Sequence, residues 1–319
     1  MKLDWESLLN DKGKFPRTFF FEDSAARYFR YGINEQLQFC LFFHLPFDEF
    51  NRPTDSLKLA NISLEEQFLD GQNTIVLTLL NDSLKVLFND LIISIVSQVK
   101  ELDKKSIKSG FISLCKDWFE LFDPIAAKLT RNEVQGIIAE LHFLKFLLNN
   151  SNFTFNEVLK AWKGPFGKGH DFELGESHFE VKGIQENKLI LSVSSEYQLD
   201  FLENQKLFLI VYSFLINSSE GETLGEVINE TVLLLRSHTA SKINIFWTAL
   251  RKAGLNPQAP DEYNEYTFKL KDVSNYNCSI YNFPSIRRSL LPDSVRQVKY
   301  ELATTLLNDF KVNDLTPFI

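Results

Sequence analysis

The pattern of hydrophobic and polar residues divides the chain into two parts. Runs of aromatic and β-branched residues bounded by polar turns predict three strands in the first part, at residues 17–21, 36–43 and 74–80. Apolar residues spaced three and four apart then predict two helices, at residues 83–101 and 106–122. Asp123-Pro124 ends this pattern, because proline stops a helix at the preceding residue. We therefore expect a mixed strand and helix domain over residues 1–125 and a second domain over residues 126–319.

A capped helix is predicted at the start of the second domain. Thr130 and Glu133 have the spacing of a capping box, in which a hydroxyl and a carboxylate bind the first free amides of a helix. The apolar stripe that we expect to be buried consists of Val134, Ile137, Ile138, Leu141, Leu144 and Leu148. At about 100° per residue, Glu140 falls beside this stripe and not on the opposite face. A carboxylate there is half desolvated, which costs stability unless a charged group meets it.

A tight hairpin is predicted after a glycine-rich loop at residues 164–169. If Gly175-Glu176 form a two-residue turn, Glu173 pairs with His178 and Asp171 pairs with Glu180. Strand alternation then places the polar residues on one face: Asp171, Glu173, His178, Glu180 and Lys182. The opposite face is apolar and consists of Phe172, Leu174, Phe179 and Val181.

The polar face of this hairpin indicates phosphodiester chemistry. Asp171 opposite Glu180 would bring two like charges to roughly 5 Å, which is destabilising unless a cation lies between them or one carboxyl is protonated. Mg²⁺ meets this need, because it takes oxygen ligands and bridges to phosphate. Lys182 points the same way as Glu180 and can reach the same water or phosphate. In such a site the metal polarises the phosphoryl oxygen and the lysine positions the attacking water.

These residues resemble the core of the PD-(D/E)XK nuclease superfamily. The resemblance is carried by Asp171, by Glu180-Val181-Lys182 and by Glu140 on the preceding helix. The elements that follow agree with it: a strand at 188–194, a turn or helix start at 194–199 and a buried strand at 207–215. More closely, the chain is similar to a bacterial PD-(D/E)XK family associated with restriction and phage-defence gene sets, at residues 136–148, 162–165, 170–173, 179–182 and 194–199. The resemblance covers most of the chain and is strongest between residues 130 and 215.

The resemblance implies a role for each of five residues. Asp171 and Glu180 would bind the metal, and Lys182 would be catalytic. Glu140 would be an auxiliary acid that contacts the metal through water, and Gln198 would contribute to the active site from the segment after the third core strand.

The histidines and one further acid are open to more than one interpretation. His170 stands where the superfamily name expects proline, a position that is known to vary. Glu173 and His178 either touch metal or DNA, or are exposed neighbours of the site. His44 lies in an apolar run and His142 on the wet side of its helix, and we interpret both as structural. Because the sequence does not indicate three nitrogen ligands for one ion, a zinc hydrolase is not expected.

The fold class that we expect is α/β. It comprises a restriction-endonuclease-like core, in which a mixed sheet is flanked by helices, preceded by a mixed α/β N-terminal domain. After residue 215 we expect helices, a strand at 266–270 and a final helix near 298–310. The N-terminal domain could serve recognition, dimerisation or partner docking.

Charge restricts the possible partners. The 319 residues include 34 Lys and Arg against 42 Asp and Glu, a formal charge of −8, which disfavours a globally basic nucleic-acid binder. A local basic track is enough for phosphate contacts. The candidates for DNA binding are Arg287, Arg288, Arg296 and Lys299, and an ordinary solvated surface is the alternative. The loop at 164–169 either approaches the DNA backbone or only connects helix to hairpin.

Several other classes are disfavoured. The three cysteines lie far apart and include no CxxC pair, so neither a disulfide framework nor a cysteine zinc site is expected. The loop at 164–169 lacks the spacing of a nucleotide P-loop. The first residues lack the apolar core of a signal peptide, and the longest apolar run, at 207–216, is too short to span a bilayer. We expect a cytoplasmic protein without membrane association.

The function that these observations favour is a Mg²⁺-dependent DNA endonuclease, in which Mn²⁺ could replace Mg²⁺. We expect it to belong to a bacterial restriction or anti-phage defence system, with an ATPase or a methyltransferase as possible partner subunits and a homodimer as a possible state. One alternative is a non-catalytic DNA-binding or assembly subunit built on a nuclease scaffold. Another is an RNA-directed nuclease with the same chemistry.

Overall fold

The chain forms two compact units in the computed structural model, which describes residues 3–23, 26–45, 56–99, 101–103, 106–124, 129–167, 169–256 and 260–319. The first unit combines residues 1–126 with 239–251 and 256–259, and the second takes the remainder of the chain. The predicted division near residue 125 falls in a segment outside the described residues. Residues 239–251, which the sequence prediction assigned to the second domain, lie in the first unit.

The first unit is built on a six-stranded antiparallel sheet. Its strand order is β1-β2-β3-β6-β5-β4. The strands are β1 (Arg17–Phe20), β2 (Phe29–Ile33), β3 (Phe39–His44), β4 (Leu57–Lys58), β5 (Ile62–Leu69) and β6 (Gln72–Leu79). The three strands predicted in this part are confirmed as β1, β3 and β6.

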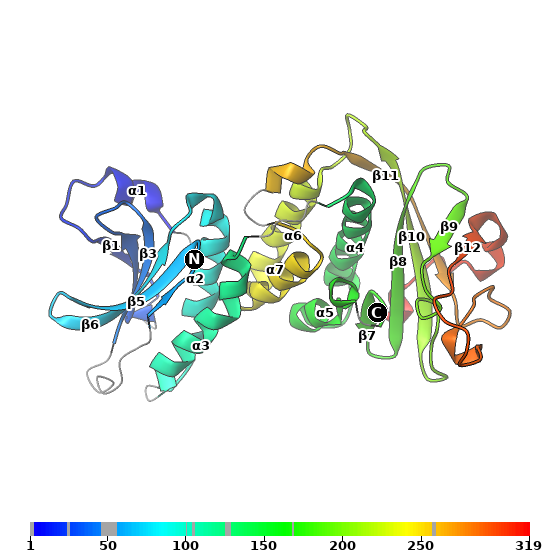
Figure 1. Ribbon diagram of the computed structural model, residues 1–319, viewed down its shortest axis with the longest axis horizontal. Helices are drawn as coiled ribbons and strands as arrows, with labels where there is room; N and C mark the ends of the chain where they lie inside the picture. Colours follow the sequence, from blue (N-terminus) through cyan, green and yellow to red (C-terminus); the bar gives the residue numbers. More distant parts are fainter. Residues whose placement is uncertain are drawn as a thin grey trace. The chain divides into compact units, whose positions relative to one another are not determined.

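Helices cover this sheet and complete the core of the first unit (Figure 1). They are α1 (Trp5–Asn10), α2 (Lys85–Val99), α3 (Ile107–Phe119) and most of α7 (Ile243–Lys252). Both predicted helices are confirmed, as α2 and α3. Phe111 of α3 packs against the rings of Phe29 and Phe43 on the sheet. From α7, the Trp247 indole donates a 2.9 Å hydrogen bond to buried Asp90 of α2.

The second unit is built on a four-stranded mixed sheet, which confirms the expected fold class. Its order is β11-β10-β8-β7, and the central pair β8 and β10 is parallel. The strands are β7 (Phe172–Leu174), β8 (Ser177–Gln185), β10 (Lys206–Ile216) and β11 (Phe268–Asn277). The helices of this unit are α4 (Arg131–Asn150), α5 (Phe155–Ala161) and α6 (Leu224–Thr239), and α4 lies beside β8 (Figure 1). A Cβ at Gly183 of β8 would come within 2.7 Å of the Gln135 carbonyl oxygen, so this glycine allows α4 to pack closely on the sheet.

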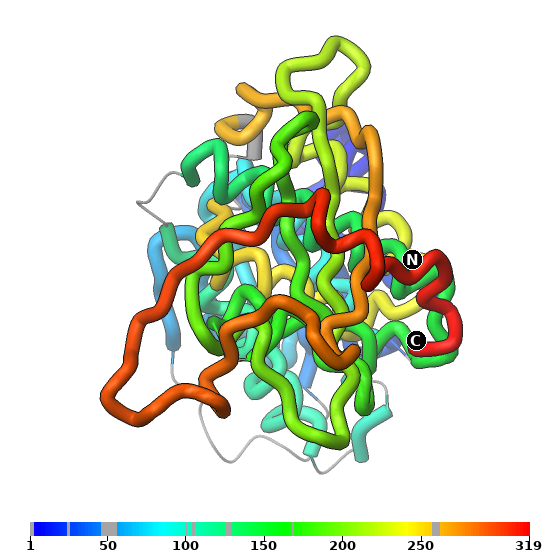
Figure 2. The backbone as a smooth tube through the Cα atoms, turned by 90° about the vertical axis from the view of Figure 1, so that its right-hand side faces the viewer, coloured from blue at the N-terminus to red at the C-terminus, as the bar shows by residue number. Residues whose placement is uncertain are grey.

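The opposite face of the mixed sheet is covered by a two-stranded sheet and the C-terminal segment. The strands β9 (Ile190–Val193) and β12 (Tyr300–Ala303) pair antiparallel. Leu191 and Leu302 from this pair pack with Leu207, Leu209 and Val211 of β10 in one hydrophobic cluster. Figure 2 shows the C-terminal segment, in orange and red, crossing this side.

The prediction of a final helix near residues 298–310 is wrong. This segment forms β12 followed by two short 3₁₀ turns at 304–306 and 308–310. Pairing with β9 overrides helix formation here, because β12 supplies the backbone partner of β9 and buries Leu302. Gln297, directly before this segment, has a φ of +58°, which a right-handed helix does not accommodate.

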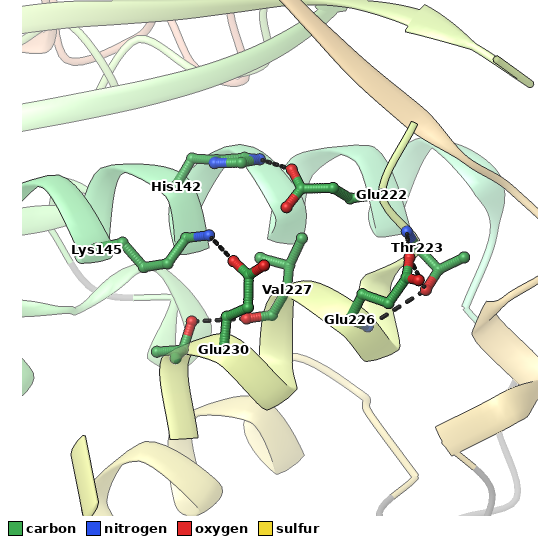
Figure 3. Close-up of polar contacts among 8 residues, drawn as sticks. His142, Lys145, Glu222, Thr223, Glu226, Val227 and Glu230 are labelled. Atoms are coloured by element: carbon green, nitrogen blue, oxygen red, sulfur yellow. Dashed lines mark hydrogen bonds and ion pairs between the residues drawn. The ribbon is translucent and has the colours of Figure 1, made fainter. Parts of the chain in front are cut away.

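The helical pattern also predicted the wrong environment for His142. It does not lie on a wet face, because its ring stacks on Tyr212 of β10 with centroids 5.9 Å apart. Its Nε2 lies 3.4 Å from Glu222, and Lys145 of the same helix lies 2.7 Å from Glu230 of α6 (Figure 3). These contacts hold α4 to its neighbours, and the same view includes the Thr223 hydroxyl that caps α6.

None of the helices in the described part of the chain combines the length and the apolar character needed to cross a bilayer.

Candidate active site

Three carboxylates from different elements converge in the second unit. Glu140 comes from α4, Asp171 from the residue before β7, and Glu180 from β8. A Cβ built on Gly164 would lie 2.7 Å from Asp171 Oδ1 and 2.8 Å from Glu140 Oε2, so both side chains lie beneath this glycine. Glu140, Asp171 and Glu180 are hereafter the acidic cluster.

The hairpin register is confirmed as far as Phe172, but the predicted pairing of Asp171 with Glu180 does not form. The register Phe172 with Phe179 and Glu173 with His178 is confirmed. Strand pairing ends at Phe172, because the Asp171 carbonyl accepts hydrogen bonds from the Lys163 and Gly164 amides, at 2.8 and 3.1 Å. The carboxylate of Asp171 turns along β8, where Oδ2 accepts a 2.7 Å hydrogen bond from the Val181 amide.

Glu140 is held by a neighbour to which the sequence prediction gave no role. The Trp162 indole donates a 2.6 Å hydrogen bond to Glu140 Oε2. Trp162 is fully buried and bridges to Phe172 at the start of the hairpin. The tryptophan therefore fixes the α4 carboxylate relative to the hairpin. A tryptophan beside a glycine-rich loop was visible in the sequence, but its partner 22 residues earlier was not.

Lys182 is the positive group of this site. Its Nζ lies 2.7 Å from Glu180 Oε1, and Glu180 is only 2% exposed. Burial lowers the pKa of Lys182, but the negative charges of Glu180, Asp171 and Glu140 outweigh burial and raise it. The lysine is therefore charged, as its predicted role requires.

The acidic cluster strongly disfavours its own ionisation. Burial and then the charge of Asp171 raise the pKa of Glu140 to about 8. Burial and then the charge of Glu180 raise the pKa of Asp171 to about 8. Burial also raises the pKa of Glu180, against the effect of Lys182. When ionised, three carboxylates and one ammonium carry a surplus of two negative charges.

The residues of the acidic cluster fit a hard divalent cation. They supply carboxylate oxygens, which are the ligands that Mg²⁺ and Mn²⁺ prefer. A side chain at Gly164 would crowd the oxygens of two of them, so the glycine keeps that space open. A cation beside these carboxylates would balance the surplus negative charge.

A cavity of about 530 Å³ adjoins the acidic cluster. Asp171 and Glu180 line it together with Gln198, Asp200 and Phe201 from the turn after β9. Gln198 therefore lies at the site, as the resemblance implies. Its amide oxygen accepts hydrogen bonds from the Ser194 amide and hydroxyl, at 2.8 and 3.2 Å, so this oxygen stabilises the turn.

The four basic residues predicted to bind DNA lie between residues 287 and 299, in different environments. Arg287 lies over the ring of Phe201 in the cavity wall, 4.7 Å from its centroid. Arg288 donates to backbone carbonyls and to Asp293 of its own loop, the latter at 3.0 Å. Arg296 and Lys299 are exposed. The structure thus engages Arg288 internally and leaves Arg296 and Lys299 facing solvent.

Two buried or partly buried acids anchor this basic segment to the turn beside the cavity. Glu196 accepts hydrogen bonds from the amides of Gln297 and Val298, at 3.3 and 2.9 Å. Asp200 accepts from the amide and hydroxyl of Ser289, at 3.0 and 2.6 Å. Partners about 90 to 100 residues apart gave no signal in the sequence.

Comparison with known proteins gives one family. A family described as "Putative PD-(D/E)XK family member, (DUF4420)" matches residues 1–305. Neither the curated proteins nor the solved structures give a match to the chain. The family match spans both units, and it includes the acidic cluster and Lys182.

Proposed function

The chain belongs to this PD-(D/E)XK family, and from that membership we propose that it is a Mg²⁺-dependent endonuclease that hydrolyses phosphodiester bonds of DNA. The observation that supports this most is the acidic cluster, in which one buried and two partly buried carboxylates converge beside one lysine. A purely structural hairpin gains nothing from this arrangement, because desolvated negative charge in excess of positive charge is destabilising.

Asp171 and Glu180 would hold the metal directly and Glu140 through water. Such an ion, when bound, polarises a phosphoryl oxygen and lowers the pKa of a water molecule. Lys182 orients the attacking water and stabilises the negative charge that develops on the phosphoryl group. Trp162 orients Glu140, and Gln198 lines the cavity in which the scissile phosphate would lie.

Contacts with the DNA backbone would come from the basic segment. Arg287, Arg296 and Lys299 are the residues that we assign to phosphate contacts, and Arg288 supports the loop that carries them. Phosphate contacts supply non-specific affinity wherever they cluster, even in a chain with a net charge of −8.

The biological setting that we propose is a bacterial restriction or anti-phage system in the cytoplasm. The low overall basicity favours an enzyme that partner subunits bring to DNA, such as an ATPase or a methyltransferase. The first unit would then serve partner docking, recognition or homodimer formation. The same negative charge also favours the second candidate function, a non-catalytic assembly subunit, which predicts no metal-dependent cleavage.

Cleavage by paired lysine variants tests the proposal. Lys182 and Lys145 both have side chains that are 19% exposed, and each lies 2.7 Å from a glutamate of the second unit. We expect Lys182→Ala to abolish Mg²⁺-dependent cleavage of plasmid DNA and Lys145→Ala to preserve it. Equal cleavage by the two folded variants would refute the assignment. Cleavage of RNA but not DNA by the wild-type chain would favour the RNA-directed alternative.

A further inference from the structure

A second group of metal-ligating side chains lies on the same hairpin. His170, Glu173 and His178 each offer one donor atom, and these atoms lie within 4.8 Å of one another. Both histidines are buried, at 6% and 7% exposure, and Glu173 is partly buried. These three residues are hereafter the histidine cluster.

The backbone brings these three residues together from two directions. Glu173 and His178 are directly opposed in the β7–β8 ladder. His170 arrives from the preceding loop, where Gly169 has a φ of +67°. A Cβ at Gly169 would collide with Glu173 Oε1, so only glycine lets this carboxylate lie against the loop backbone. The His170 amide also points at Glu173 Oε1, at 3.4 Å.

The imidazole rings of His170 and His178 face each other through their Nδ1 atoms. His170 Nδ1 and His178 Nδ1 are 3.0 Å apart. Two facing ring nitrogens repel unless a proton or a metal ion lies between them. Tetrahedral Zn²⁺, with Zn–N bonds of 2.0–2.1 Å, would separate its two nitrogen ligands by about 3.3 Å. The observed spacing is therefore close to that of a zinc-bound pair.

The surroundings of His170 also suit a metal ligand. When Nδ1 binds a metal, the ring carries its proton on Nε2, and ligand histidines usually donate that proton to a carbonyl or carboxylate. His170 Nε2 is buried without a hydrogen bond of good geometry among the described residues. Burial lowers the pKa of the His170 ring, and the backbone of Asp200 opposes this effect.

We propose that the histidine cluster binds Zn²⁺, with His170, Glu173 and His178 as ligands and a water molecule in the fourth position. Two imidazoles and one carboxylate favour Zn²⁺ over Mg²⁺, whereas the all-oxygen acidic cluster favours Mg²⁺ or Mn²⁺. A zinc ion here ties His170 to the hairpin and thereby holds the next residue, Asp171, in the acidic cluster. This role is structural and does not depend on the chain being a nuclease.

Zinc titration of the full chain tests this proposal. We expect the chelator-treated protein to bind one Zn²⁺ per chain in calorimetry, and to give the visible absorption of four-coordinate Co²⁺. His178→Ala should abolish this binding. Because replacing a buried histidine could prevent folding, Glu173→Gln serves as a second variant, for which we expect an affinity at least about tenfold lower with the fold retained.

Two control variants locate the ion. Asp171→Asn disrupts the acidic cluster, and His142→Ala removes a partly buried histidine elsewhere in the second unit. Both variants should keep the Zn²⁺ affinity of the wild type. Absence of Zn²⁺ binding by the wild type, or unchanged affinity in both His178→Ala and Glu173→Gln, would overturn the proposal. Loss of binding in Asp171→Asn would place the ion in the acidic cluster and also overturn it. Mg²⁺-dependent cleavage by the wild-type chain tests the nuclease proposal separately.

Discussion

Each unit of the molecule contains a glutamate–lysine ion pair, and the two pairs differ in what surrounds them. In the first unit, Glu66 of β5 and Lys108 of α3 are 3.4 Å apart and join a strand to a helix. In the second unit, Glu180 and Lys182 are 2.7 Å apart on the same strand, and Asp171 and Glu140 act on both. The first pair links two elements of secondary structure, whereas the second belongs to a group with a negative surplus.

This difference separates a structural ion pair from a functional one. An ion pair that joins two elements is explained by the packing that it links. One buried and two partly buried carboxylates beside one lysine are stable only if they take up protons or a cation, because desolvated surplus charge is costly. The charge balance of a buried site is therefore more informative about function than the presence of an ion pair.

The largest expected effect comes from replacing one carboxylate in each unit, Asp171 in the second and Glu66 in the first. Asp171→Asn should lower the rate of Mg²⁺-dependent DNA cleavage roughly 10²- to 10³-fold or more, since it removes one of the two direct metal ligands. Glu66→Gln should leave the rate unchanged and only reduce stability. Initial cleavage rates of both variants, with circular dichroism to verify folding, test the contrast. A similar loss of rate in Glu66→Gln would contradict it.

A substitution of Gly164 should remove the space for the cation without removing any ligand. The Cβ of Gly164→Ala would lie 2.7 and 2.8 Å from two carboxylate oxygens, so we expect Mn²⁺ affinity to fall about tenfold or more. Gly136→Ala on α4 is the matched control, because its Cβ would meet nothing within 4 Å. Calorimetric titration with Mn²⁺ measures both. Wild-type affinity in Gly164→Ala would exclude a cation at this position.

Two tryptophans donate to carboxylates, one in each unit, and extend the same comparison: Asp90 is buried and Glu140 is partly buried. Trp162→Phe and Trp247→Phe each remove an indole donor, from Glu140 and from Asp90 respectively, and should each cost about 1–3 kcal/mol of unfolding free energy. Only Trp162→Phe should also weaken Mn²⁺ binding, by several-fold, because Glu140 belongs to the acidic cluster. Urea denaturation and metal titration of both variants measure these effects. Weaker metal binding in Trp247→Phe would contradict the division.

Stability of the metal-free chain should also depend on pH. The pKa of Asp171 and of Glu140 rises from the ordinary 3.8 and 4.5 to about 8 in the folded, metal-free chain. Between these values the folded state holds protons that the unfolded state has released, so stability is greatest below the ordinary values and falls as pH rises towards 8. Urea denaturation in chelator across this range should show the decline, and Mg²⁺ or Asp171→Asn should reduce it. A metal-free stability that rises over this range would contradict the assignment.

The sequence predicted those parts of the site that depend on local spacing. Two-residue alternation and the Gly175 turn placed Glu173 opposite His178, and the helical repeat placed Glu140 beside the buried stripe. Contacts between distant segments were not predictable in this way. The contacts of Glu196 with the Gln297 and Val298 amides and the pairing of β12 with β9 depend on tertiary structure, which overrides a local pattern. His142 was misplaced for the same reason, since β10 covers a helical face that looked polar.

The route of the chain through α7 has a consequence for dividing the protein into fragments. This helix belongs to the first unit, although it follows residues 127–238, which belong to the second. Its buried side chains include Phe246, Trp247 and Leu250. A fragment that ends at residue 125 lacks these side chains, and one that starts at residue 126 carries them without their binding surface. Exposed apolar faces of this kind promote aggregation. Cutting the polypeptide once between the units should therefore yield two insoluble fragments. A soluble first unit requires that α7 be added to it, and a soluble second unit requires that α7 be deleted.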